Sequence, residues 1–247
     1  IAGPEIDELE EALTARTGAQ VAVACASGTA ALIIPLLAEG VGAGDAVFLP
    51  AFTYNATANA VLLAGATHVF VDIEKSTYNI DVEDLARKIE LVRREGGLKP
   101  RCVIPVDLFG APADYKKIHE IAARENLFVL ADAAQSFGGA LGDKAVGNLA
   151  PATSTSFFPG KALGAYGDAG AVFGNEAYKG EIWKSIRWHG TDDSRKESVR
   201  VGFNGRMDSF QAAVLLEKLA IFDAELAARE QIAADYDGRL SEIARPQ

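Results

Sequence analysis

Short apolar runs that alternate with helical patterns constrain the fold of this chain more than any other feature of its sequence. We expect five of these runs to be buried strands, at residues 21–24, 46–49, 67–71, 102–106 and 128–131. Apolar residues at helical spacing predict helices at residues 4–17, 29–37, 56–63, 82–94 and 115–125. Strands that alternate with crossover helices predict an α/β fold with a mostly parallel sheet and helices on both faces. Ligands then bind beyond the carboxyl ends of the strands.

The pattern changes after Thr153. A glycine-rich region, a helix, a polar loop and a long helix rich in Ala, Leu and Glu are expected at about 158–174, 176–188, 190–200 and 208–236. A chain of 247 residues is long enough for one large α/β domain. We expect that domain over residues 1–225. Residues 226–247 are expected to end the long helix and to start a C-terminal domain that this chain does not complete.

Composition argues against several classes of protein. The net charge of -10 disfavours a sequence-independent grip on nucleic acid or on an anionic membrane, because both need clustered Lys and Arg. Two charge-free stretches, 17–38 and 46–71, are long enough to span a membrane, but proline and polar residues interrupt both, so we expect no spanning helix. Cys25 and Cys102 lie far apart in apolar runs and are interpreted as buried thiols, which fits a cytoplasmic protein.

Two smaller patterns give structural expectations. Asp81, followed by Asp84 three residues later, is expected to form an N-cap pair for the helix at 82–94. Trp183 and Trp188 share a helical segment and are expected to be packing residues rather than stacking platforms.

Three places along the chain carry residue types suited to a charged ligand. Gly28 and Thr29 lie where a strand turns into a helix and could bind an anion, although an ordinary turn is an equal alternative. Asp132 ends the strand at 128–131, where an acid is either a ligand contact or a helix cap. Lys161 is surrounded by small and apolar residues. Desolvation there lowers a lysine pKa and favours imine formation, although a lone loop lysine is more often solvated.

Six motifs follow one another in the order SGTAAL, PAFTYNATANA, ADAAQSFG, TSFFPGKALGAYGDAGAVF, RWHG and GFNGRMDSFQAAV. Together they closely resemble the DegT/DnrJ/EryC1/StrS family of sugar aminotransferases, from about Gly3 to near Ile221. The resemblance implies the large domain of a fold-type I pyridoxal-phosphate (PLP) transferase. It also implies PLP as the cofactor and a homodimer with shared active sites.

The resemblance assigns roles to individual residues. Lys161 would form the Schiff base with PLP and later move a proton, and Asp132 would pair with the pyridine nitrogen so that the ring acts as an electron sink. The other contacts would be a ring stack from Tyr54, a hydrogen bond near the phenolic oxygen from Gln135, and phosphate contacts from Gly28, Thr29 and Ser156.

Three further residues follow from the last two motifs. Asn204 resembles the family position that reaches the phosphate of the neighbouring subunit's cofactor, so the site would need a dimer. Arg206 is a candidate for the substrate's anionic groups. His189 lies in a His-Gly turn, where a structural role is favoured over a catalytic one because no partner is visible. His68 and His119 have no second ligand nearby in the sequence, so no metal site is expected.

Several positions depart from the family pattern. Gly160 precedes the lysine where Ser is common, GDAGA replaces the usual GDGGA, and Ala131 stands where an acid often precedes the aspartate. None of these departures removes a catalytic group. The family's C-terminal domain, which helps to close over the sugar, is expected to be missing from this chain.

The resemblance implies transfer of an amino group, from glutamate, to a nucleotide-linked keto-sugar in polysaccharide or glycan precursor biosynthesis. Segments such as DIEKSTYNID and VDLFGAPADY look most like enzymes acting on UDP-linked 3-keto-hexuronates. A PLP-dependent sugar dehydratase is an alternative, but such relatives carry histidine in place of Lys161. A noncatalytic regulator that binds a sugar nucleotide is a second alternative. A nicotinamide enzyme is a third, but no G-x-G-x-x-G follows the first strand.

Overall fold

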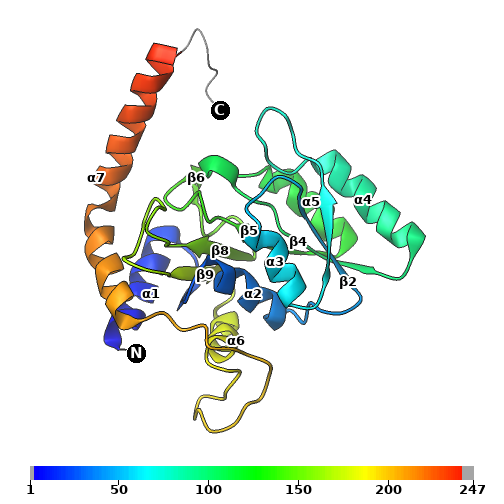
Figure 1. The fold of residues 1–247 in the computed structure, drawn as a ribbon, viewed down its shortest axis with the longest axis horizontal. Helices are drawn as coiled ribbons and strands as arrows, with labels where there is room; N and C mark the ends of the chain where they lie inside the picture. The colour runs from blue at the N-terminus through cyan, green and yellow to red at the C-terminus, as the bar shows by residue number, and fades with distance from the viewer. Residues whose placement is uncertain (1–2, 241–247) are drawn as a thin grey trace.

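The computed structural model describes residues 3–240, which form a central sheet between layers of helices (Figure 1). Seven strands form the sheet: β1 (Val21–Cys25), β2 (Asp45–Pro50), β3 (Thr67–Val71), β4 (Lys99–Val103), β5 (Phe128–Asp132), β8 (Ala152–Ser156) and β9 (Gly170–Gly174). Their spatial order is β1-β9-β8-β5-β4-β2-β3. Only β9 runs antiparallel to its neighbours within this described sheet, so the predicted mostly parallel α/β fold is confirmed. A small hairpin joins β6 (Ala140–Leu141) to β7 (Lys144–Ala145).

Helices cover both faces of the sheet. One face packs against α2 (Gly28–Ala38), α3 (Ala56–Leu63) and α6 (Ala177–Arg187). The other packs against α4 (Val82–Glu95), α5 (Tyr115–Glu125), α1 (Pro4–Thr17) and the first part of α7 (Ser209–Leu240). Val47 belongs to the first core and Phe48 to the second, because successive side chains of a strand point to opposite faces. Beyond Phe222, the last buried residue of α7, that helix extends away from the core (Figure 1).

Most predicted elements lie within two residues of the observed bounds, but the strand predicted at 102–106 is displaced by three residues. β4 ends at Val103, and Pro105 has no N–H to continue the ladder. The Pro105 carbonyl instead accepts a hydrogen bond from the Asp132 N–H (2.8 Å). A short 3-10 turn, η1 (Leu108–Gly110), follows. Strand β4 is therefore interrupted at Pro105, and Val106 still pairs with Asp132 through a parallel bridge at the edge of the cleft.

Strands β8 and β9 are absent from the sequence expectation. The five residues of β8 are Ala, Thr, Ser, Thr and Ser, yet all are buried. The Ser154 and Thr155 hydroxyls donate to the Ala131 and Ala133 carbonyls (3.1 and 3.0 Å), which lets polar side chains lie inside. A hydropathy pattern cannot detect such a strand.

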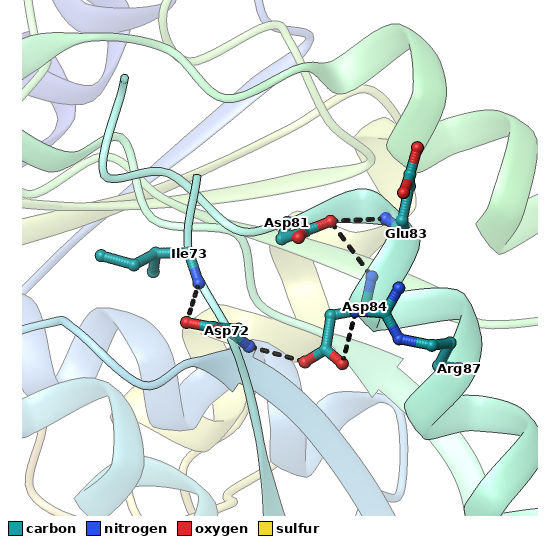
Figure 2. Close-up of polar contacts among 6 residues, drawn as sticks. All are labelled: Asp72, Ile73, Asp81, Glu83, Asp84 and Arg87. Atoms are coloured by element: carbon teal, nitrogen blue, oxygen red, sulfur yellow. Dashed lines mark hydrogen bonds and ion pairs between the residues drawn. The ribbon is translucent and has the colours of Figure 1, made fainter. Parts of the chain in front are cut away.

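The start of α4 shows one cap rather than a reciprocal pair (Figure 2). The Asp81 carboxylate accepts hydrogen bonds from the N–H groups of Glu83 and Asp84 (2.8 and 3.1 Å), so its role as N-cap is confirmed. The expectation for Asp84 is wrong. Its carboxylate accepts from the Asp72 N–H (2.8 Å) and pairs with Arg87 (3.1 Å), which ties α4 to the end of β3.

The two tryptophans differ. Trp183 is fully buried, as expected for a packing residue. Trp188 is half-buried and packs against its own chain through the guanidinium groups of Arg195 and Arg206, which lie over its ring at 4.0 and 4.5 Å from the centroid.

Glu10 is a buried anion that joins three elements. Its carboxylate accepts from the Ala24 N–H of β1 (2.9 Å) and pairs with Arg187 (2.6 Å) and Lys184 (3.3 Å) of α6. Glu10 and Arg187 are both largely buried, so each compensates the charge of the other.

We therefore expect Glu10→Ala to lower the free energy of unfolding by about 3–5 kcal/mol, because it leaves the Arg187 guanidinium buried without a counter-ion. Glu11→Ala, at an exposed position on the same helix, should change that free energy by less than about 0.5 kcal/mol. Urea unfolding followed by circular dichroism measures both. Equal effects for the two variants would show that the buried pair does not stabilise the fold.

Candidate active site

A cleft of about 410 Å³ opens where the carboxyl ends of β1, β2, β4, β5 and β8 meet. Parallel strands bring their carboxyl ends to one edge of a sheet, which is where ligands bind in this class of fold. Seven residues that the sequence predicts for the site line this cleft: Gly28, Thr29, Tyr54, Asp132, Gln135, Ser156 and Lys161.

Three other predicted residues do not line this cleft. Asn204 is exposed and pairs through its backbone with Trp188. Arg206 places its guanidinium over the Trp188 ring. His189 has a φ of 58° and donates its N–H to the Phe203 carbonyl (3.0 Å), a geometry that fits a turn. A site that uses Asn204 or Arg206 must therefore combine them with a different surface.

Asp132 lies at the bottom of the cleft, at the end of β5, and is 5% exposed. One oxygen of its carboxylate accepts a hydrogen bond from the Thr57 hydroxyl (2.8 Å), and the other accepts from the Ala134 N–H (3.2 Å). Burial raises the pKa of this carboxyl, while the two hydrogen bonds and the Lys161 ammonium act against that rise. The group is held in place with one side facing the cleft.

Lys161 lies in the loop that joins β8 to β9. Its N–H donates to the Phe158 carbonyl (2.8 Å), and the Ala165 N–H donates to the Phe157 carbonyl (2.8 Å). Gly164 allows this compact turn, since a Cβ there would lie 2.5 Å from the Pro159 carbonyl oxygen. The loop thus presents a half-buried amine to the same cleft as Asp132.

The N-terminus of α2 forms another wall of the cleft. Ser27 caps the helix by accepting from the Ala30 N–H (3.1 Å). A Cβ at Gly28 would lie 2.7 Å from the Ser156 Cβ, so only glycine lets α2 approach β8 this closely. Gly28, Thr29 and Ser156 thereby place N–H and hydroxyl groups around a helix N-terminus, an arrangement that binds phosphate.

Gln135 has a defined amide orientation. Its side-chain oxygen accepts from the Phe109 N–H (2.6 Å), which only an oxygen can do. Within residues 3–240 its NH₂ group has no protein partner, so it can donate to a ligand in the cleft.

Three residues of this region are missing from the sequence expectation. Thr57, fully buried, contacts the Asp132 carboxylate, and its only signal is its place in the PAFTYNATANA motif. Asp168 lines the cleft and belongs to the GDAGA segment. Asp107 follows β4 just as Asp132 ends β5, a signal that the sequence does carry.

Asp107 is 1% exposed and lies beside Asp132. Its carboxylate accepts from the Ala113 N–H (3.0 Å), the Tyr115 hydroxyl (2.8 Å) and the Ser136 hydroxyl (2.8 Å). Burial raises the pKa of Asp107 from its ordinary value of 3.8 to about 6, against these hydrogen bonds and with help from the nearby Asp132 charge.

The raised pKa predicts a pH effect on stability. The folded state holds the Asp107 proton more tightly than the unfolded state, so the stability from this group is fully present below about pH 4 and is lost as pH rises through about 6. A rise from 3.8 to about 6 corresponds to about 3 kcal/mol. Asp107→Asn keeps the shape and can keep all three hydrogen bonds, because a serine hydroxyl can also accept.

Relative to this variant, the unmutated protein should therefore lose about 3 kcal/mol of unfolding free energy between about pH 3 and about pH 7. Urea unfolding at several pH values within that interval measures the difference. Parallel pH profiles for the two proteins would mean that Asp107 titrates normally.

Residues 3–240 contain neither a metal-binding cluster nor a membrane-spanning helix. No group of three His, Cys, Asp or Glu residues is arranged to hold a metal ion there. His119 contacts the Leu149 carbonyl (2.8 Å). None of the helices in that range is long and apolar enough to cross a membrane.

Known proteins resemble this chain over its whole length. The sequence model of the DegT/DnrJ/EryC1/StrS aminotransferase family matches residues 1–247. The UDP-2-acetamido-2-deoxy-3-oxo-D-glucuronate aminotransferase of Pseudomonas aeruginosa is 45% identical over 98% of this chain and 66% of its own length. The chain thus spans just under two thirds of that relative.

Solved structures agree with this match. An aminotransferase of the same family from Brucella abortus has 46% identity and a TM-score of 0.97, covering 100% of this chain and 67% of its own. NtdA from Bacillus subtilis, solved with bound cofactor PMP, has 32% identity and a TM-score of 0.87, covering 98% of this chain and 54% of its own.

Proposed function

The chain belongs to the DegT/DnrJ/EryC1/StrS aminotransferase family, and from that premise we propose that its full-length protein is a PLP-dependent aminotransferase. It transfers an amino group, from glutamate, to a nucleotide-linked keto-sugar. One observation supports this proposal most: residues from five separate strand ends place a buried carboxylate, an amine and a phosphate-type helix N-terminus around one cleft.

The residues of the cleft fit PLP in number and chemistry. Gly28, Thr29 and Ser156 would hold its phosphate at the N-terminus of α2. Tyr54, whose side chain is 73% exposed at the cleft, would cover one face of the ring. The Gln135 NH₂ group would donate to the phenolic oxygen, because its own oxygen is held by Phe109. When bound, PLP supplies an electron sink for the carbon that gains or loses the amino group.

Two residues of this chain handle protons. The Asp132 carboxylate would keep a proton on the cofactor's ring nitrogen, and its hydrogen bonds to Thr57 and Ala134 fix the orientation of the carboxylate. The Lys161 Nζ atom would hold the cofactor and, as a free amine, would take a proton from the substrate carbon and release it again as general acid.

The sugar is proposed to be a UDP-linked 3-keto-hexuronate, which the printed activity of the Pseudomonas aeruginosa relative supports. The product would enter polysaccharide or glycan precursor synthesis.

We further propose a homodimer in which Asn204 and Arg206 serve the partner's cleft, since neither lines its own. Residues 1–225 form the cofactor domain in this proposal. The cytoplasm is the proposed compartment because Cys25 and Cys102 are buried free thiols.

A direct assay tests the reaction. Full-length protein with PLP and glutamate is offered UDP- and dTDP-linked keto-sugars, and the products are read by mass. The proposal expects an amino product from a UDP-linked 3-keto-hexuronate and 2-oxoglutarate in equal amount. A deoxy product without nitrogen would instead indicate sugar dehydration, the alternative that Lys161 disfavours. Binding of a sugar nucleotide without turnover would indicate a regulator.

A further inference from the structure

Three aromatic side chains form an exposed cluster beside the cleft. The rings of Phe52, Tyr78 and Phe109 contact one another in tilted and edge-on pairs, with centroids 5.9 to 6.3 Å apart. Their exposed fractions are 49%, 42% and 58%. We call these three residues the aromatic platform. Exposed rings gathered in one patch, rather than scattered singly, are typical of a binding surface.

The backbone of the platform adopts a costly conformation. Tyr78 has a φ of 61° and Phe109 a φ of 56°, both in the left-handed region that bulky residues rarely occupy. Such strain persists only where the surrounding structure imposes it, and it concentrates at ligand sites. Two of the three rings are thus exposed by a backbone conformation that lowers local stability.

Buried hydrogen bonds lock the two strained loops together. The Asn79 side chain, 6% exposed, donates to the carbonyls of Ala111 and Pro112 (3.2 Å each). Its oxygen accepts from the Leu108 N–H (3.4 Å). Asn79 follows Tyr78 in the chain, and Leu108 precedes Phe109, so this clamp fixes both rings. A surface fixed before binding loses less entropy when a ligand arrives.

The platform is continuous with the cleft. Phe52 directly precedes Thr53 and Tyr54, which line the cleft. On the other side, the Phe109 N–H donates to the side-chain oxygen of Gln135, another lining residue (2.6 Å). The rings therefore border the mouth of the cleft next to Gln135.

The size of the cleft leaves room for only part of the proposed substrate. A volume of about 410 Å³ is at the small end of ligand pockets. PLP and the reacting sugar occupy such a cleft, so the base of a nucleotide-linked sugar must lie outside it. Aromatic faces at the mouth can stack on a base, because every base has a π-face.

We propose that the aromatic platform stacks on the base of a nucleoside diphosphate and so forms the nucleotide end of the substrate site. This inference rests on the proposed function and adds the residues that hold the base. Stacking of this kind is tolerant of the base's identity, because it does not read hydrogen-bonding edges.

The test measures binding by calorimetry in the full-length, cofactor-loaded protein. The probes are UDP and inorganic pyrophosphate, which lacks a base. Phe52→Leu and Phe109→Leu should each weaken UDP binding about five- to hundredfold while leaving pyrophosphate binding within about twofold. The matched control is Phe70→Leu, which removes an exposed ring of β3 that does not line the cleft and should leave both affinities unchanged.

Several results would overturn the inference: unchanged UDP affinity in both platform variants, no UDP binding by the unmutated protein, or an equal loss for UDP and pyrophosphate. Loss of the dimer in sedimentation would instead assign the rings to a subunit interface.

Borohydride trapping of the cofactor on Lys161 distinguishes failure of this inference from failure of the proposed function. If trapping succeeds but the platform substitutions leave the UDP affinity unchanged, only this inference fails. If trapping fails, the proposed function fails.

Discussion

Replacing Asp132 with asparagine is expected to lower turnover by about 10²- to 10³-fold, the usual cost of losing one preorganised electrostatic contact to the reacting system. Asparagine keeps the shape of the side chain: its single oxygen can accept from the Ala134 N–H while its NH₂ group donates to the Thr57 hydroxyl, so the fold should persist. It cannot carry the negative charge that holds a proton on the ring nitrogen of PLP. The loss should therefore fall on the chemical step, which single-turnover kinetics with saturating substrate would isolate.

The matched control for this variant is Asp143→Asn, which removes an exposed carboxylate near the β6–β7 hairpin, away from the cleft residues. It should turn over at the unmutated rate, and both variants should retain the cofactor after gel filtration. Near-normal turnover of Asp132→Asn would show that the buried carboxyl only caps the turn after β5, through its bond to the Ala134 N–H.

Mixing an Asn204→Ala protein with a Lys161→Ala protein is expected to restore activity that neither has alone. Asn204 is exposed and absent from the cleft of its own chain, which supports a role in the partner's site. If it acts across the interface, a mixed dimer has one site with both defects and one with neither. Random exchange of subunits should then return about a quarter of the unmutated activity.

The outcome depends on which chain Asn204 serves. If it serves its own chain, every site of a mixed dimer carries one defect, and activity should not exceed that of the Asn204→Ala parent. A Lys161→Ala protein mixed with a Glu11→Ala protein should keep about half of the unmutated activity whether or not subunits exchange, so it controls for the effect of mixing alone. Cofactor affinity should also rise with protein concentration in the unmutated dimer, because dimer formation and phosphate binding would be linked.

The sequence predicts those helices and strands whose burial follows from a pattern of apolar residues. Strand β5 is a run of apolar residues that ends in an acid, and both its burial and the position of Asp132 at the sheet edge follow from that pattern. Helix α3 has the predicted bounds, and α2 extends the prediction by one residue at each end. Conversely, hydropathy does not detect β8, because its Ser and Thr residues are buried and two of them, Ser154 and Thr155, donate hydrogen bonds to neighbouring carbonyls.

Site residues could be predicted where they belong to a sequence motif. They could not be predicted where only contacts in the folded structure bring them together. Lys161 and Gln135 came from the resemblance, and both line the cleft. Thr57 lies 75 residues from Asp132 in the chain, and no local sequence pattern predicts the hydrogen bond between them. The aromatic platform likewise joins loops after β2, β3 and β4, which only the folded sheet brings together.

The account depends most directly on Lys161 as the residue that anchors PLP. Borohydride reduction of the full-length holoenzyme, followed by proteolysis and mass spectrometry, reports which lysine carries the cofactor. The account predicts a phosphopyridoxyl group on Lys161 and none on the nearby Lys144 or Lys179, both of which lie outside the cleft lining. An adduct on another lysine, or no adduct in a protein that binds PLP, would contradict it.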